Sequence, residues 1–170
     1  MPRPTPRRPS SAKKTGRRAP FPPSQRRRGR IASPVTERTV SEAFTSLPWI
    51  EPQVVEIPSS ESDQPIYSRL YLPPEEAKGL RPAVVFIHGA GYLQNAHYGW
   101  SSYFREFMFH TLLARRGYVV LDMDYRASAG YGRDWRTAIY GRMGEPELVD
   151  LRDGVNWLVE RHRVDPQRVG

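Results

Sequence analysis

At 170 residues the chain has room for one domain with a sizeable core, and its formal charge of +8 is concentrated at one end. Residues 1–30 hold eleven Lys or Arg, no Asp or Glu and seven of the 17 prolines, so the rest of the chain is mildly acidic. Because the chain contains no cysteine, disulfides and thiolate chemistry are excluded.

Residues 1–44 are predicted to form a disordered basic tail and linker, since they offer many prolines and few apolar side chains to bury. No pattern of interleaved aromatic residues accompanies the arginines, so we expect no specific role in nucleic-acid binding. No apolar stretch of the length of a signal peptide or a membrane span is present. This favours a cytoplasmic location for the chain as given.

The folded part is predicted to cover residues 45–170. Residues 54–57 and 66–72 read as two short strands, and the polar turn between them favours antiparallel pairing. Residues 83–87 form an apolar run without polar alternation, which is typical of a strand buried on both faces.

The central strand runs directly into His88, Gly89, Ala90 and Gly91. Small residues let the backbone turn sharply and place no bulk between the N–H groups and a ligand. A buried strand that ends in such a loop is a common way to present amide hydrogens to a developing oxyanion.

A helix is predicted next, capped by Ser101 or Ser102 and ended by Gly117. Its apolar spacing predicts one buried face, made of Phe104, Phe107, Met108 and Leu112. His110 lies four residues after Glu106, which favours a solvent-exposed pair on this helix. Residues 118–125 then read as the next buried strand. It is expected to run parallel to the strand at residues 83–87, because a helix connects the two.

Residues 133–140 favour a short helix, and a longer amphipathic helix is predicted to begin at Pro146. Val169 reads as the first residue of a further strand. Two antiparallel strands followed by a βαβα unit predict an α/β fold, namely part of an α/β-hydrolase three-layer sandwich.

Four segments in this order carry a resemblance to a known family: residues 84–91, 117–126, 128–135 and 153–170. Together they resemble the catalytic domain of the prolyl oligopeptidase family of serine peptidases, which includes dipeptidyl and acylaminoacyl peptidases. The resemblance implies an α/β-hydrolase with a Ser-Asp-His triad whose nucleophile lies in a Gly-x-Ser-x-Gly turn. The 170 residues contain no such turn, so we expect the chain to end before the nucleophile and to be inactive alone.

The resemblance also implies site residues. His88, Gly89, Ala90 and Gly91 would form the oxyanion loop, with the N–H of Ala90 and that of Gly89 as donors. Tyr92 and Arg126 would line the substrate pocket, although a salt bridge is an equal alternative for Arg126. A peptide is the implied substrate, and no cofactor or metal is expected. Ala127 stands where the family commonly has glycine.

Other interpretations remain open at this stage. Asp122 and Asp124 share one face of a strand, and a structural role, such as capping the loop or pairing with Arg126, is favoured over acid–base or metal chemistry. A carboxylesterase or lipase of the same fold is the first alternative, and an interaction protein acting through the basic tail is the second. An unpaired apolar edge on the central strand would favour oligomers or aggregates.

Overall fold

The computed structural model describes residues 41–76, 78–91, 93–99 and 104–170. The basic tail predicted for residues 1–44 therefore lies outside the described residues up to residue 40. A compact unit begins at Glu42 and extends to Gly170. Its helices and strands, in chain order, are α1 (Glu42–Thr45), β1 (Gln53–Ile57), β2 (Ile66–Tyr71), β3 (Arg81–Ile87), α2 (Phe104–Arg115), β4 (Val119–Met123), α3 (Arg133–Thr137), α4 (Pro146–His162) and β5 (Val164–Val169).

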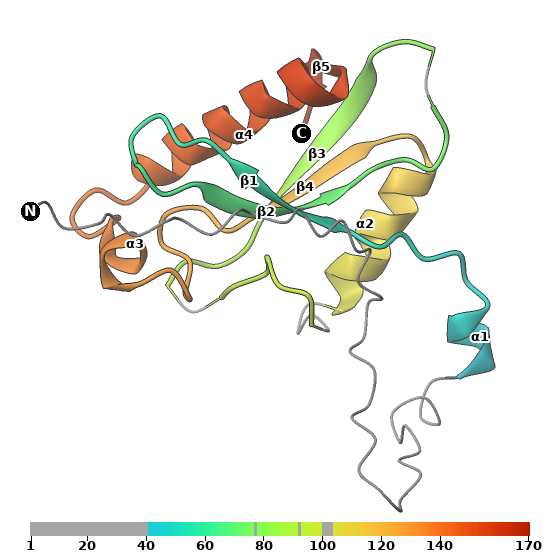
Figure 1. Ribbon diagram of the computed structural model, residues 1–170, viewed down its shortest axis with the longest axis horizontal. Coiled ribbons are helices and arrows are strands. Elements are labelled where there is room, and N and C mark those ends of the chain that lie inside the picture. Colours follow the sequence, from blue (N-terminus) through green and yellow to red (C-terminus); the bar gives the residue numbers. More distant parts are fainter. Residues whose placement is uncertain (1–40, 77, 92, 100–103) are drawn as a thin grey trace, which may run out of the picture. The chain divides into compact units, whose positions relative to one another are not determined.

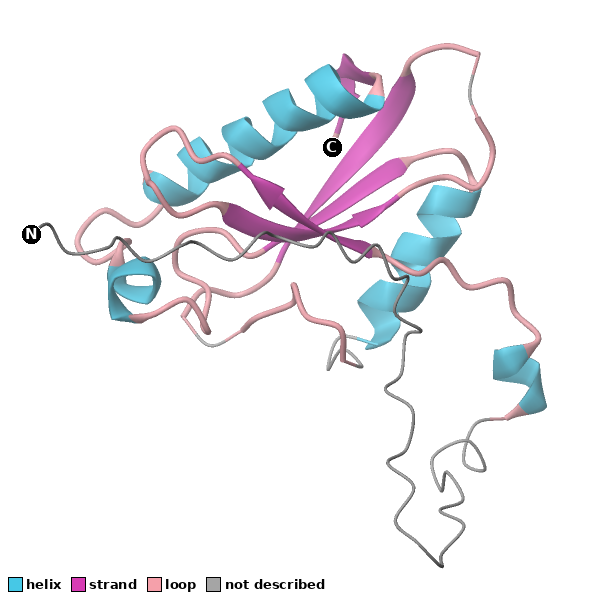
Figure 2. Ribbon diagram, in the orientation of Figure 1, coloured by secondary structure: helices cyan, strands magenta, loops and turns pink. Residues whose placement is uncertain are grey.

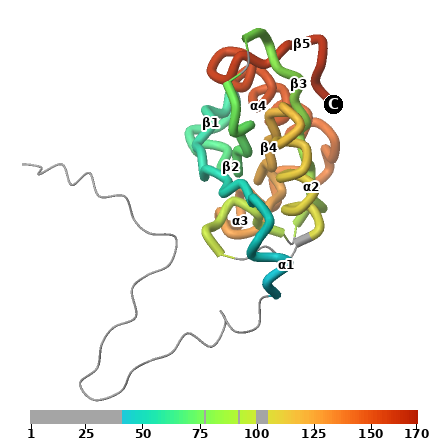
Figure 3. Tube along the Cα trace, turned by 90° about the vertical axis from the view of Figure 1, so that its right-hand side faces the viewer, coloured from blue at the N-terminus to red at the C-terminus, as the bar shows by residue number. Residues whose placement is uncertain are grey.

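The strands form one mixed sheet in the order β1-β2-β4-β3-β5 (Figure 1). β1 pairs with β2 and β2 with β4 in antiparallel fashion, whereas β3 pairs in parallel with β4 and with β5. The predicted antiparallel hairpin and the parallel strand-helix-strand unit are therefore confirmed. In the side view of Figure 3, β5 lies at the top beside β3, and α1 lies at the opposite end.

The prediction for the last strand was wrong in two respects. β5 begins at Val164 rather than Val169, because the polar run around Pro166 forms an irregularity between two paired ends. The edge of β3 that was expected to be unpaired is occupied by β5, and the Val85 N–H donates to the Gly170 carbonyl at 2.9 Å. Ile87, at the end of β3, is 48% exposed. Oligomer formation through the sheet edge stays a prediction.

The sheet carries a helix on each face, which gives the three layers expected (Figure 1). Leu121 and Met123 of β4 belong to the larger apolar core, together with Leu158 of α4. Val120 points to the other face, where it packs with Tyr71 and with Ala114 of α2. Because side chains alternate along a strand, β4 contributes to both layers.

The buried face of α2 differs from the predicted one. Met108 and Leu112 are 37% and 41% exposed, whereas His110, Thr111 and Ala114 are buried. The helix is thus turned so that two polar residues face the sheet. The predicted solvent-exposed pair of His110 with Glu106 is wrong, because the imidazole packs edge-on against the rings of Tyr71 and Phe86.

Burial, followed by the charge of Arg69, lowers the pKa of His110 to about 4. The unfolded chain takes up a proton at the ordinary histidine pKa, and the folded chain does so only near the lower value. Stability should therefore fall by up to about 3 kcal/mol as the pH drops from about 6.5 to about 4. Urea unfolding of the wild type and of His110→Leu across this range measures the effect. The variant should lose less stability on acidification, and equal slopes would contradict the prediction.

Candidate functional site

The loops that follow β3 and β4 meet beyond the carboxyl ends of these strands (Figure 2). In the first loop, the Gly91 N–H donates to the Ala127 carbonyl at 2.6 Å, and Gly91 has a φ of 87°. The N–H groups of Gly89 and Ala90 have no hydrogen-bond acceptor among the residues that the structure describes. As far as the described part of the chain goes, the amides of Gly89 and Ala90 are therefore open to an external acceptor, whereas that of Gly91 is not.

His88 is buried directly beneath this loop, with 4% of its surface exposed. Its Nδ1 lies 2.9 Å from the Gly89 carbonyl oxygen, and its Nε2 lies 2.9 Å from Oδ1 of Asp124. Both partners are acceptors, so both ring nitrogens carry a proton in this arrangement. Burial lowers the pKa of His88, but the bonds to Asp124 and to the Gly89 carbonyl outweigh it and raise the pKa above its ordinary value.

Asp124 is the centre of the hydrogen-bond network below the loop. Besides His88, its carboxylate accepts the N–H groups of Asn95 at 2.8 Å and Ala96 at 2.9 Å. The Tyr131 hydroxyl also donates to it. Burial raises the pKa of Asp124, but these donors outweigh it and hold the pKa below the ordinary value. Asp124 thus links His88, residues 95–96 and Tyr131 to the end of β4.

Asp122 lies on the same face of β4 and binds the side-chain amide of Asn95 at 3.0 Å. Burial raises its pKa to about 6, although the amide of Asn95 opposes the shift. The described residues contain no group of three or more His, Cys, Asp or Glu side chains placed to hold a metal ion. The contacts of both carboxylates fit the first of the two structural roles that the sequence favoured, capping the loop, with Asn95, Tyr131 and His88 as partners. Arg126 pairs with other carboxylates.

Ser128, His88 and Asp124 come together but do not form a catalytic triad. The Ser128 hydroxyl lies 3.3 Å from Nε2 of His88, which is the nitrogen that also binds Asp124. In a triad the acid and the nucleophile bind opposite ring nitrogens, so that the ring can pass a proton. Ser128 is also fully buried, which leaves no room for a substrate carbonyl.

Arg126 is held by carboxylates on two sides. Its Nε and Nη2 each lie 2.9 Å from Oδ1 of Asp150 in α4, and its Nη1 lies 2.8 Å from Glu61. Its backbone N–H donates to the other oxygen of Asp150 at 2.6 Å. These contacts favour the salt-bridge interpretation, and a role of Arg126 in a substrate pocket stays a prediction. Tyr92, its predicted companion, lies outside the described residues.

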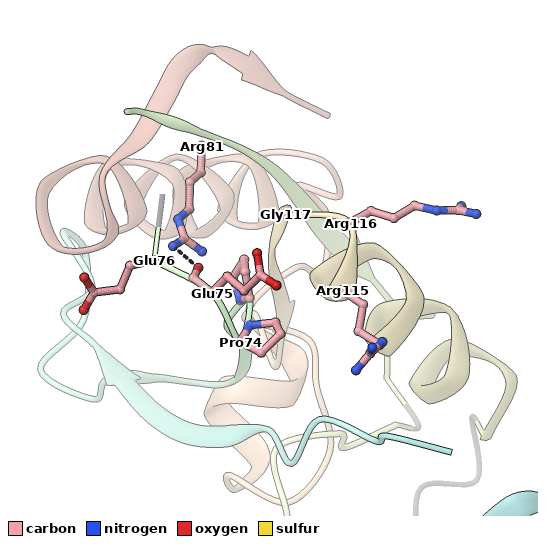
Figure 4. Close-up of a pocket in the computed structure, with 8 residues that line it drawn as sticks. Pro74, Glu75, Glu76, Arg81, Arg115, Arg116 and Gly117 are labelled. Atoms are coloured by element: carbon pink, nitrogen blue, oxygen red, sulfur yellow. Dashed lines mark hydrogen bonds between the residues drawn. The ribbon is translucent and has the colours of Figure 1, made fainter. Parts of the chain in front are cut away.

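A surface pocket lies at the other end of the parallel strands, where Arg81 begins β3 and Gly117 precedes β4 (Figure 4). Figure 4 shows Arg81 bonded to the Glu75 carbonyl oxygen, while Arg116 extends away from the pocket. Open α/β sheets bind ligands beyond the carboxyl ends of their strands. The pocket lies at the amino ends of β3 and β4, opposite the side where such sheets bind ligands. The loop after β3 is therefore the better candidate for the functional site.

Residues 103–170 match the sequence model of the prolyl oligopeptidase family. These residues belong to the prolyl oligopeptidase family. Among curated relatives, dipeptidyl aminopeptidase BIII of Pseudoxanthomonas mexicana is 30% identical over 72% of this chain and 19% of its own length. Human dipeptidyl peptidase 8 is 31% identical over 78% of this chain and 15% of its own length. The chain thus spans less than one fifth of either relative.

Solved structures of the family share the fold. The acylaminoacyl peptidase of Pyrococcus horikoshii superimposes with a TM-score of 0.62 at 24% identity, over 75% of this chain and 20% of that protein. Dipeptidyl peptidase 4 of Porphyromonas gingivalis gives the same TM-score at 20% identity, over 76% of this chain and 18% of that protein. The fold is therefore that of part of an α/β-hydrolase, as predicted.

Within the described residues, no helix is long and apolar enough to cross a membrane. The sequence did not indicate that Asn95, Tyr125 and Tyr131 belong to the network around the loop. The one signal available was the position of Asp124 and Tyr125, directly after a buried strand.

Proposed function

We propose that this chain supplies the oxyanion-binding segment of a serine peptidase of the prolyl oligopeptidase family, which hydrolyses peptide bonds through an acyl-enzyme. The observation that carries the proposal is the pair of consecutive amides, Gly89 and Ala90, that lack an acceptor among the described residues at the carboxyl end of β3. Relatives that are named dipeptidyl peptidases support the substrate class.

In this mechanism a serine attacks the scissile carbonyl, and the N–H groups of Gly89 and Ala90 donate to the oxygen of the tetrahedral intermediate. Each such donor lowers the barrier by roughly 3 kcal/mol in characterised enzymes. No Gly-x-Ser-x-Gly turn occurs in the 170 residues, so the proposal assigns the nucleophile to polypeptide beyond them. The 170 residues alone should then not turn over substrate.

Replacing Ala90 by proline removes one donor, because proline has no N–H. In the gene product that contains these residues, we expect kcat to fall by about 10²- to 10³-fold with little change in KM. The matched control is Ala90→Gly, which keeps the N–H and should retain activity close to the wild type. Dipeptidyl and N-acylaminoacyl p-nitroanilides are the substrates, and burst kinetics would report the acyl-enzyme.

Two results would contradict the proposal. A gene product without activity on any of these amide substrates, but active on short-chain p-nitrophenyl esters, would favour the carboxylesterase alternative. Equal activity of the proline and glycine variants would remove Ala90 from the oxyanion site. The alternative of an interaction protein acting through residues 1–44 stays a prediction that salt-dependent binding of RNA or anionic lipid would test.

A further inference from the structure

The two open amides belong to peptide groups whose carbonyls are both held from the inside. The Tyr125 hydroxyl donates to the carbonyl of His88, which is in the same peptide group as the Gly89 N–H. Nδ1 of His88 donates to the carbonyl of Gly89, which is in the same peptide group as the Ala90 N–H. The rings of His88 and Tyr125 stack with centroids 5.2 Å apart, so the two donors lie on one side of the loop.

A trans peptide is planar, and its C=O and N–H point in opposite directions. Holding the two carbonyls toward the buried rings therefore directs the Gly89 and Ala90 N–H groups away from those rings. We propose that Tyr125 and doubly protonated His88 are positioning residues, which orient the oxyanion donors by binding the carbonyls of the same two peptides. This inference rests on the proposed function only for the identity of the ligand.

The orientation of the Ala90 amide depends on the charge of His88. The ring faces the carboxylate of Asp124 directly and that of Asp122 at longer range, while Tyr131 donates to Asp124 from the far side. The buried negative charge keeps a proton on Nε2, and Nδ1 must carry a second proton to donate to the Gly89 carbonyl.

Loss of one proton changes this arrangement. A neutral ring keeps its hydrogen on Nε2, next to Asp124, and presents a lone pair on Nδ1 to the Gly89 oxygen 2.9 Å away. Two lone pairs at this distance repel each other, so the Gly89–Ala90 peptide must rotate. The Ala90 N–H then leaves its position, whereas the Gly89 N–H is still fixed through Tyr125. Deprotonation of His88 should thus remove one of the two oxyanion donors.

NMR on the 170-residue chain tests this without any enzymatic assay. The ring nitrogens of His88 and the backbone amides of Gly89 and Ala90 are followed from about pH 5 upward, past the histidine reference pKa of about 6.5. We expect both ring nitrogens to be protonated at about pH 6, near that reference pKa. The Ala90 amide shift should then change with the same midpoint as the ring, and the Gly89 amide should change less.

Two variants separate the roles. His88→Asn keeps an N–H donor near the Nδ1 position but does not titrate, so the Ala90 amide should become insensitive to pH. Tyr125→Phe keeps the stacked ring and removes the hydroxyl, so the Gly89 amide shift should change while the Ala90 midpoint stays that of His88.

A neutral His88 ring at about pH 6, or an Ala90 amide that does not follow the ring's deprotonation, would overturn the inference. Because these readouts come from the loop alone, such a result leaves the proposed peptidase function standing. Conversely, an inactive gene product would refute the function and leave the positioning of the amides intact.

Discussion

Replacing Asp124 by alanine is expected to lower the free energy of unfolding by about 3–5 kcal/mol. The substitution removes the acceptor for His88, for the Tyr131 hydroxyl and for two backbone N–H groups, of which His88 and the Asn95 N–H are buried and the others part-buried. An uncompensated buried imidazolium also has to give up its proton. Because domains are stable by only about 5–15 kcal/mol, this single change should remove a large part of the total.

The matched control is Asp165→Ala. Asp165 also binds an arginine side chain and a backbone N–H, but it lies at the surface. Its loss should lower the free energy of unfolding far less than the loss of Asp124, because solvent screens such pairs. Urea unfolding at pH 7 followed by circular dichroism measures both variants. Similar midpoints for the two would show that the network around Asp124 does not stabilise the fold.

Asp150→Ala is expected to have an effect of similar size, about 3–5 kcal/mol, in a different layer of the domain. The carboxylate of Asp150 is fully buried and accepts from the Arg126 backbone N–H and from two nitrogens of its guanidinium. Without Asp150, Nε and the backbone N–H of Arg126 would lose their acceptor, although only 8% of the Arg126 side chain is exposed. The loop after β4 would lose its bonds to Asp150 and keep the bond from Nη2 of Arg126 to the Pro146 carbonyl at 3.1 Å as an attachment to the start of α4.

The second carboxylate on the same guanidinium provides the comparison. Glu61 binds Nη1 of Arg126 at 2.8 Å, but its side chain is 46% exposed. Glu61→Gln should therefore cost about 1 kcal/mol or less. Both variants are compared by urea unfolding midpoints. If Glu61→Gln destabilises the protein as much as Asp150→Ala, burial is not what makes the Asp150 pair important.

The positions of β2 and β3 along the chain could be predicted from the sequence because each of these strands has a local signal. The alternation of residues 66–72 and the apolar run of residues 83–87 mark their strands without reference to distant residues. The glycine at position 117 marks the end of α2 for the same reason, since it has a φ of 94° there. Such features depend on the backbone and on immediate neighbours.

The orientation of α2 could not be predicted in this way. Hydropathy favours Met108 and Leu112 for the core, but the buried face of α2 is set by contacts with residues far away in the sequence. His110 lies edge-on to the rings of Tyr71 and Phe86, and Ala114 packs with Val120. β5 was missed at its start for a related reason, because Pro166 and its polar neighbours do not resemble a strand.

The candidate site also has one part that could be predicted from the sequence and one that could not. The loop after β3 could be recognised from four consecutive residues, since glycine and small side chains are a local signal. The side chains that hold this loop could not be recognised, because Asp124, Tyr125 and Tyr131 lie 30 or more positions away from it in the sequence. Ala127, where the family commonly has glycine, has a φ of 116°, which is a glycine-like value that only the folded loop reveals.

The two carboxylates of β4 also determine how this strand can align. Side chains alternate between faces, so a shift of one residue against β2 and β3 would exchange the two sides. Asp122 and Asp124 would then enter the apolar layer beside Leu158, without Asn95, His88 or Tyr131 to receive them. Misaligned pairings of the sheet are therefore destabilised. The groups that hold the loop also restrict the central strands to one register.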